Sequence, residues 1–185
     1  MDSKTRQRLK LILLFALFAG PLLLAWLWYT NIDHAWLQPK TVNKGTLIQP
    51  PRPLTVDGAP TRSGTLSLKG KWTLVVAASD CAQDCKRSLY VTRQVRIALG
   101  KDLERVQRLL VTRRLPDIDL TKTQPDLAVA APDAFPGFKE FTPPGPDHLL
   151  LVDPLGNVMM YYPLRVEPKD LHDDLKRLLR YSQTG

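Results

Sequence analysis

The sequence has few of the residues that most often hold metals and redox centres. Its 185 residues include two cysteines and three histidines, so the sulfur chemistry of the chain is confined to one pair. The sequence also lacks an internal repeat, a block of lysines and arginines, and a basic stripe interleaved with aromatic residues. The net charge of +8 is therefore expected to be spread over a solvated surface, which argues against nucleic acid as a partner.

Charged residues are absent from 11–32, a run rich in leucine and phenylalanine. A segment of this length and apolarity crosses a bilayer as a helix. Trp26, Trp28 and Tyr29 stand near its end, as aromatic residues do at a membrane interface. Residues 1–10 carry four basic side chains and one acidic side chain, which predicts a cytoplasmic N-terminus and a C-terminal part in the periplasm. The prediction is a single-pass protein of the inner membrane.

A cleaved signal peptide is the alternative interpretation of the same segment. The apolar run is long for a signal peptide, and no small-x-small cleavage site follows it before Trp28. An uncleaved anchor is therefore the favoured interpretation.

The rest of the chain divides by composition into two parts. Residues 33–64 contain five prolines and few candidates for a core, which predicts an extended tether with a short strand near 46–48. Residues 65–185 suffice for one domain with its own core and are too few for two.

The stretch 69–100 contains both cysteines and is expected to organise this domain. An apolar run, 72–78, predicts a buried strand, and Cys81 and Cys85 follow it at once. Asp80 is a candidate N-cap with Gln83 three residues later, so a helix is predicted over Cys81–Leu99, with Gly100 as its C-terminal cap.

Spacing by four places the two cysteines on one face of that helix. Their Cα atoms are then about 6 Å apart, which is within reach of a disulfide. The helix N-terminus, with Lys86 and Arg87 nearby, favours a reactive thiolate. The pair is thus predicted to form a reversible bond or to hold one soft metal ion. A structural disulfide remains the alternative, although bridges of that kind usually close longer loops.

The remaining segments complete a recognisable order of elements. A second strand is predicted at 105–112, parallel to the first, and 113–147 reads as a loop with a short helix around 125–130. A hairpin is predicted over 148–162, and a final amphipathic helix from position 168. This is the order of an α/β, thioredoxin-like fold, with the two thiols at the start of its first helix.

At this point the sequence resembles the Sco/SenC proteins, membrane-anchored thioredoxin-fold proteins of the copper-handling pathway that assembles cytochrome c oxidase. The likeness rests on the strand at 70–76, the Cys81-x-x-x-Cys85 pair, and Asp147-His148 followed by an Asp-Pro-x-Gly turn. The resemblance implies a copper site with Cys81 and Cys85 as thiolate ligands and His148 as the imidazole ligand. It also implies an oxidase subunit or another assembly factor as partner.

The sequence departs from the family at two points. Ala82 and Lys86 stand where the family usually has proline after each cysteine, and His148 lies closer to the Asp-Pro turn. Three functions therefore remain open: copper handling, thiol–disulfide exchange with a copper-site partner, and non-catalytic docking during oxidase assembly.

Overall fold

The computed structural model describes residues 3–31, 42–54, 58–62, 64–135 and 147–182. They fall into two compact units, Met1–Val42 and Asn43–Gly185, which are described separately. The first contains the helix α1 (Ser3–Asn31), and its stretch Thr5–Thr30 is long and apolar enough to cross a membrane. Within the predicted tether of 33–64, residues 33–41, 55–57 and 63 lie outside the described part.

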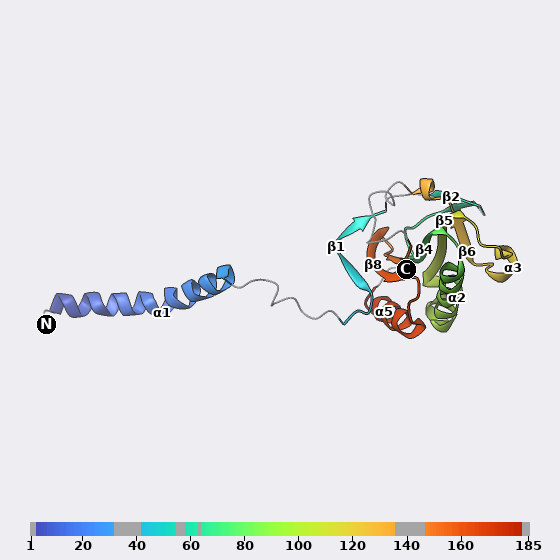
Figure 1. Ribbon diagram of the computed structural model, residues 1–185. Helices are drawn as coiled ribbons and strands as arrows, with labels where there is room; N and C mark the ends of the chain where they lie inside the picture. Colours follow the sequence, from blue (N-terminus) through green and yellow to red (C-terminus); the bar gives the residue numbers. More distant parts are fainter. Residues whose placement is uncertain (1–2, 32–41, 55–57, 63, 136–146, 183–185) are drawn as a thin grey trace. The chain divides into compact units, whose positions relative to one another are not determined.

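The second unit is built on a six-stranded sheet with the order β1-β8-β7-β4-β5-β6 (Figure 1). Strands β4, β5 and β6 are mutually parallel. On the other side of β4 each strand is antiparallel to its neighbour: β7 to β4, β8 to β7 and β1 to β8. The strands are β1 (Thr46–Pro53), β4 (Trp72–Asp80), β5 (Val106–Arg114), β6 (Leu127–Ala130), β7 (His148–Val152) and β8 (Asn157–Pro163). A small hairpin, β2 (Ala59–Thr61) and β3 (Gly64–Leu66), stands apart from this sheet.

Two helices, α2 (Gln83–Ala98) and α5 (Pro168–Tyr181), lie side by side on one face of the sheet (Figure 1). In α5 the residues Leu171, Leu175 and Leu179 are buried, as their helical spacing predicts. They share one core cluster with alternate residues of β4 and β7 and with both cysteines. A second cluster covers the opposite face of the sheet and includes Leu54 and Phe135. The predicted α/β, thioredoxin-like arrangement is confirmed.

The structure differs from the predicted tether at the start of the domain. Residues 46–53, expected to belong largely to an extended linker, form β1 and pair with β8 at the edge of the main sheet. Three of the tether prolines lie in this strand, which is tolerated because an edge strand has one side without ladder partners. The compact unit accordingly begins near Asn43.

The short helix predicted around 125–130 is wrong. Leu127–Ala130 is the strand β6, parallel to β5, and the nearby helical turn is α3 (Leu120–Thr123). Asp119 caps α3 by accepting hydrogen bonds from two backbone N–H groups, and bonding to Thr121 and Lys122 lowers the pKa of its carboxyl. Pairing with β5 outweighs the modest helix propensity of a short Leu-Ala-Val-Ala segment. The predicted loop residues 136–146 lie outside the described part.

A buried carboxylate fastens the first residues of the domain to α5. Asp174, 2% exposed, accepts hydrogen bonds from the backbone N–H groups of Lys44 and Gly45 and from the hydroxyl of Tyr162, at 2.8–3.0 Å. Burial and the neighbouring carboxylate of Asp174 raise the pKa of Tyr162 well above its ordinary value. The Tyr162 ring lies where a side chain at Gly45 would stand.

Gly45→Ala is therefore expected to destabilise the domain, by about 1–3 kcal/mol, because the added Cβ overlaps the Tyr162 ring. The midpoint of thermal unfolding of the full-length chain in detergent measures the effect. Thr46→Ala, at the exposed neighbouring position, is the matched control. An unchanged midpoint for Gly45→Ala would contradict the packing described here.

Candidate active site

The two cysteines lie at the junction of β4 and α2 and are joined by a disulfide. Cys81 directly follows the last residue of β4, and Cys85 belongs to the first turn of α2. Their Cα atoms are 4.9 Å apart, somewhat closer than the spacing on an ideal helix, because Cys81 stands just before the helix. The structure thus brings the predicted pair together.

The predicted N-cap is wrong. Asp80 is the last residue of β4, paired with Arg114 of β5, and the helix begins at Gln83 with Ala82 as N-cap. Because β5 extends to Arg114, it keeps Asp80 in the extended conformation. The Asp80 carboxylate forms an ion pair with Arg114 at 3.4 Å, and α2 has no side-chain cap.

Both cysteines are covered, Cys81 being 2% and Cys85 1% exposed. A cavity of about 250 Å³ reaches Cys85 from the surface. Its walls come from the first turn of α2, from Asp147 before β7, and from Leu164 and Arg165 after β8. Chemistry at the disulfide therefore requires access through this cavity or local opening around it.

Three carboxylates line the cavity, and each is held by a different partner; the first, Asp80, is paired with Arg114 as described above. Asp84 forms an ion pair with Arg165 at 2.8 Å, which links the first turn of α2 to the segment after β8. Asp147 accepts a hydrogen bond from the backbone N–H of Ser79 at 2.8 Å. This contact fixes the start of β7 beside the end of β4.

The predicted third ligand, His148, points elsewhere. The next residue, Leu149, packs into the core cluster that contains both cysteines, and side chains alternate between the faces of a strand. The His148 ring therefore lies on the opposite face, where it meets Tyr161 edge-on with ring centroids 5.4 Å apart. Within the described residues, no group of three His, Cys, Asp or Glu side chains is placed to share a metal ion. The role of His148 as a ligand stays a prediction.

Asp147 and Arg165 are the site residues that the sequence did not single out for chemistry. Asp147 belongs to the Asp-His pair that carries the family resemblance, but the resemblance implies a role only for His148. No local sequence pattern marks Arg165 as a site residue, because it reaches α2 only through the position of the segment that follows β8 in the folded domain.

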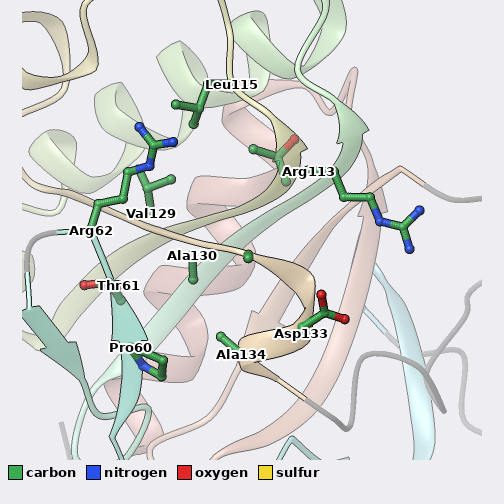
Figure 2. A pocket seen from close by; sticks show the side chains of 11 residues that line it. Pro60, Thr61, Arg62, Arg113, Leu115, Val129, Ala130, Asp133 and Ala134 are labelled. Atoms are coloured by element: carbon green, nitrogen blue, oxygen red, sulfur yellow. The ribbon is translucent and has the colours of Figure 1, made fainter.

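A larger cavity, of about 560 Å³, lies at the carboxyl ends of β5 and β6 (Figure 2). Arg62 reaches over its wall beside Val129, whereas the Arg113 side chain points away from it (Figure 2). Neither cysteine lines this cavity. Size alone therefore does not identify the reactive site in this protein.

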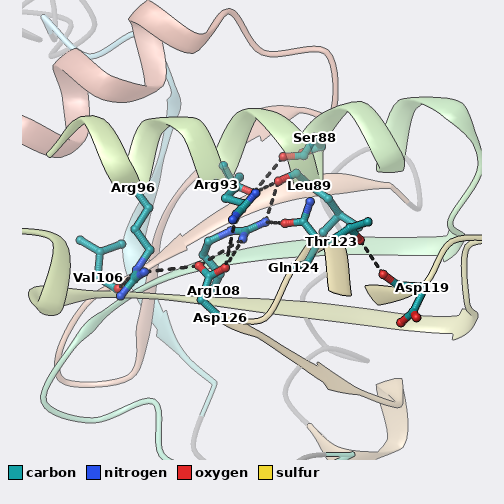
Figure 3. A network of polar contacts seen from close by, with 11 residues as sticks. Ser88, Leu89, Arg93, Arg96, Val106, Arg108, Asp119, Thr123, Gln124 and Asp126 are labelled. Atoms are coloured by element: carbon teal, nitrogen blue, oxygen red, sulfur yellow. Dashed lines mark hydrogen bonds and ion pairs between the residues drawn. The ribbon is translucent and has the colours of Figure 1, made fainter. Parts of the chain in front are cut away.

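A buried arginine of β5 connects α2 to the sheet. Arg108, 1% exposed, extends from β5 towards the helix (Figure 3). Its guanidinium donates to the backbone oxygen of Leu89 at 2.6 Å and to the Gln124 side chain at 2.8 Å, and pairs with Asp126 at 3.2 Å. Burial lowers the pKa of Arg108, and the Asp126 charge opposes that shift. These contacts hold the helix that carries Cys85 against the sheet.

Sequence profiles of known families match this chain in two segments. A sequence profile described as a transmembrane-like, thioredoxin-like C-terminal domain matches residues 72–182, which is more than half of the chain. This chain belongs to that family. A second profile, the transmembrane-like N-terminal domain, matches residues 2–31, which cover the apolar helix. The transmembrane-like, thioredoxin-like family therefore accounts for both units of the chain.

Solved structures show the same fold. The apo Sco1 protein from Thermus thermophilus is 18% identical, with a TM-score of 0.56 over 74% of this chain and 97% of that chain. A putative thioredoxin from Neisseria meningitidis is 16% identical, with a TM-score of 0.54 over 71% and 93%. ScoI with copper bound, from Arabidopsis thaliana, is 13% identical, with a TM-score of 0.51 over 71% and 98%.

These likenesses confirm the thioredoxin-like fold and the resemblance to Sco proteins at the level of fold. No protein of curated function matches the chain. The chemistry must therefore be argued from the site itself.

Proposed function

We propose that this protein is a membrane-anchored thiol–disulfide exchange protein in which Cys81 and Cys85 are the redox pair. The observation that carries the proposal is the bonded pair at the start of α2 in a thioredoxin-like fold. A disulfide that closes a five-residue loop adds only about 2 kcal/mol to the free energy of unfolding by the loss of chain entropy in the unfolded state. Stabilisation alone is therefore a poor explanation for this disulfide. A bond between the residue that follows β4 and the first turn of α2 is local, so it can break and re-form without rearranging the domain.

The exchange proceeds in two displacements. A thiolate of the partner attacks one sulfur of the disulfide, forms a mixed disulfide and releases the other cysteine as a thiolate. A second partner thiolate then attacks the partner's own sulfur in the mixed disulfide. The partner leaves oxidised, and Cys81 and Cys85 are left reduced. In the reverse direction the reduced pair donates two electrons to a partner disulfide.

The proposed location follows from the N-terminal unit. Its basic flank, with Arg6, Arg8 and Lys10, favours an N-terminus in the cytoplasm, and this orientation places the domain in the periplasm. Disulfides persist in that compartment, which agrees with the bonded pair.

Handling of copper is the second candidate. Reduction of the disulfide leaves two soft sulfur ligands with Cα atoms 4.9 Å apart, which suits Cu(I) as cargo. The fit is partial, because His148 lies on the other face of the sheet. Exchange needs only the two sulfurs and is therefore the better supported function.

The proposed partner is a protein with copper-site cysteines, such as a cytochrome c oxidase subunit or one of its assembly factors. The support is the Sco/SenC resemblance of the sequence around Cys81, Cys85 and Asp147. Either chemistry, reducing such cysteines or supplying their copper, serves the same assembly step. A docking protein without chemistry is the outcome if neither activity is found.

Equilibration of the full-length chain in detergent with glutathione tests the exchange proposal. We expect glutathione to reduce the disulfide of the folded protein reversibly, and the ratio of reduced to oxidised protein to follow the glutathione ratio. Thiol alkylation with mass measurement reports that ratio. A disulfide that yields only after unfolding would establish a structural bridge and overturn the proposal.

Titration of the reduced full-length chain with Cu(I), against a competing chelator, tests the second candidate. We expect about one Cu(I) per chain, lost when either cysteine is replaced by serine and more weakly held at acid pH, where the thiols keep their protons. His148→Ala is expected to leave the affinity within about twofold, because an imidazole on the other face cannot reach the ion. A large loss of affinity would make His148 a ligand.

A further inference from the structure

Two open cavities adjoin each other along β6, the edge strand of the main sheet. The first is the cavity of about 560 Å³ shown in Figure 2, and the second measures about 420 Å³. They share Arg62, Leu115 and Val129 in their walls, and the two together are called the β6 groove below. Most of the wall of the second cavity is apolar, from Leu115, Pro116, Ile118, Leu120, Pro125 and Leu127. Apolar surface gathered at a sheet edge is typical of a site where another chain binds.

Arg62 is the basic side chain that lines both cavities of the groove. Its backbone N–H donates to the carbonyl oxygen of Val129 at 2.9 Å, which fixes this residue beside β6. The side chain is exposed, and within the described residues its guanidinium has neither an ion pair nor a hydrogen bond. The carboxylate of Asp119, in the second cavity, caps α3 and pairs with Lys122 at 3.5 Å. Arg62 is therefore a cation among apolar side chains that a carboxylate of another molecule can reach.

The groove lies at the same end of the sheet as the disulfide. Strands β4, β5 and β6 are parallel, so their carboxyl ends meet at one edge. Cys81 follows β4, and its backbone N–H donates to the carbonyl oxygen of Arg114, the last residue of β5, at 3.3 Å. Thr112 and Arg113, the two residues before Arg114, line the first cavity of the groove. A protein bound in the groove is thus held at the edge where the cysteines lie.

We propose that the β6 groove docks an extended, apolar segment of the exchange partner, and that Arg62 pairs with an aspartate or glutamate in that segment. The identity of the bound protein as an exchange partner rests on the proposed function, whereas docking itself transfers no electrons. An open groove along an edge strand suits an extended chain better than a small molecule, because small-molecule sites enclose most of their ligand. The cavity that reaches Cys85 is only about 250 Å³, so a second contact area is needed for a specific complex.

Binding of a labelled peptide to the full-length chain in lipid nanodiscs tests the proposal. The probe is a fluorescein-labelled heptapeptide of leucine and proline around a central glutamate, and its matched form has glutamine instead. Fluorescence anisotropy gives both affinities. We expect wild type to bind the glutamate peptide about fivefold more tightly, because its carboxylate pairs with Arg62.

Arg62→Gln is expected to remove this preference, so that the two peptides bind with affinities within about 1.5-fold of each other. Arg113→Gln is the matched control, since Arg113 lines the first cavity but its side chain points away from it (Figure 2). It should keep the fivefold preference. A preference that survives Arg62→Gln, or is lost equally in Arg113→Gln, would overturn the assignment of Arg62.

The apolar wall is tested with a variant at Ile118, which is 39% exposed and lines the second cavity. Ile118→Ser is expected to weaken both peptides about fivefold, because apolar contact is lost whatever the charge of the peptide. Leu155→Ser, at an exposed position in the turn between β7 and β8, is the control and should leave both affinities unchanged. Equal affinities for Ile118→Ser and wild type would overturn the role of the groove.

The outcomes separate docking from exchange. Absence of peptide binding, while glutathione still equilibrates with the disulfide, would overturn the docking proposal and leave the exchange function standing. Binding that depends on Arg62 in a protein whose disulfide does not exchange would support the groove and overturn the exchange function alone. Displacement of the glutamate peptide by micromolar octanoate would indicate a site for small carboxylates and overturn the assignment to a protein segment.

Discussion

Serine in place of either cysteine is expected to abolish catalysed thiol–disulfide exchange and to reduce it to the background reaction of the probe. Reduction of a partner disulfide needs both sulfurs, because the mixed disulfide formed on one is resolved by the other. Without added reductant, Cys81→Ser and Cys85→Ser should each react once with glutathione disulfide and then stop. Turnover of a disulfide substrate by the full-length chain, with glutathione as reductant, measures the loss.

The serine variants are expected to lose exchange activity without unfolding. Removing a bridge that closes a five-residue loop costs about 2 kcal/mol, so the serine variants should remain folded. Ser88→Ala is the matched control, since Ser88 is buried one turn after Cys85 and its hydroxyl has no hydrogen-bond partner within the described residues. It should keep full turnover. Sustained turnover by either serine variant would refute the redox-pair assignment.

Asp126→Ala is expected to cause the largest loss of stability, about 3–5 kcal/mol, because it leaves a buried cation without its counter-charge. Arg108 has a fully covered side chain and pairs with Asp126 at 3.2 Å. The same carboxylate also faces Arg96 at 3.4 Å and Arg93 at 3.9 Å. Without it, three arginines face one another across the junction of α2 and β6.

Arg108→Met removes the buried cation itself, whereas Asp126→Ala leaves that cation buried without its counter-charge. Methionine removes the cation and keeps part of the volume, so its effect on the free energy of unfolding should be smaller than that of Asp126→Ala. Denaturant unfolding of the full-length chain in detergent, followed by near-UV circular dichroism, gives the comparison. Asp117→Ala, at an exposed loop position, is the control and should stay within about 0.5 kcal/mol of wild type. Equal effects for Asp126→Ala and Asp117→Ala would show that the buried pair contributes nothing.

The elements that were predicted correctly are those with strong local patterns. The continuous apolar run marked the buried strand β4, and the helical spacing of leucines marked α5. The composition of the turn between β7 and β8 marked their hairpin. The cysteine spacing likewise placed the two sulfurs within reach of each other, because a separation of four residues at the start of a helix keeps two side chains close even though Cys81 stands just before α2.

The predictions that failed depend on neighbours distant in the sequence. Pairing with β5 made Asp80 part of a strand instead of a helix cap, and the same strand drew 127–130 into the sheet. No local pattern indicated that Arg108 would be buried beside a counter-charge from Asp126, the residue just before β6. Local propensity is a small energy in each case, and strand pairing or charge burial exceeds it.

The amino-acid order by itself determined the long apolar N-terminal helix, the thioredoxin-like succession of strands and helices, and the nearness of the two sulfurs, because each depends on residues within a few positions of one another. Only the tertiary structure decided what surrounds those sulfurs. The pleat of β7 turns His148 to the far face of the sheet, and the return of β8 brings Arg165 to the Cys85 side. Which face a strand residue occupies depends on register with strands far away in the chain, and no short stretch of sequence encodes that register.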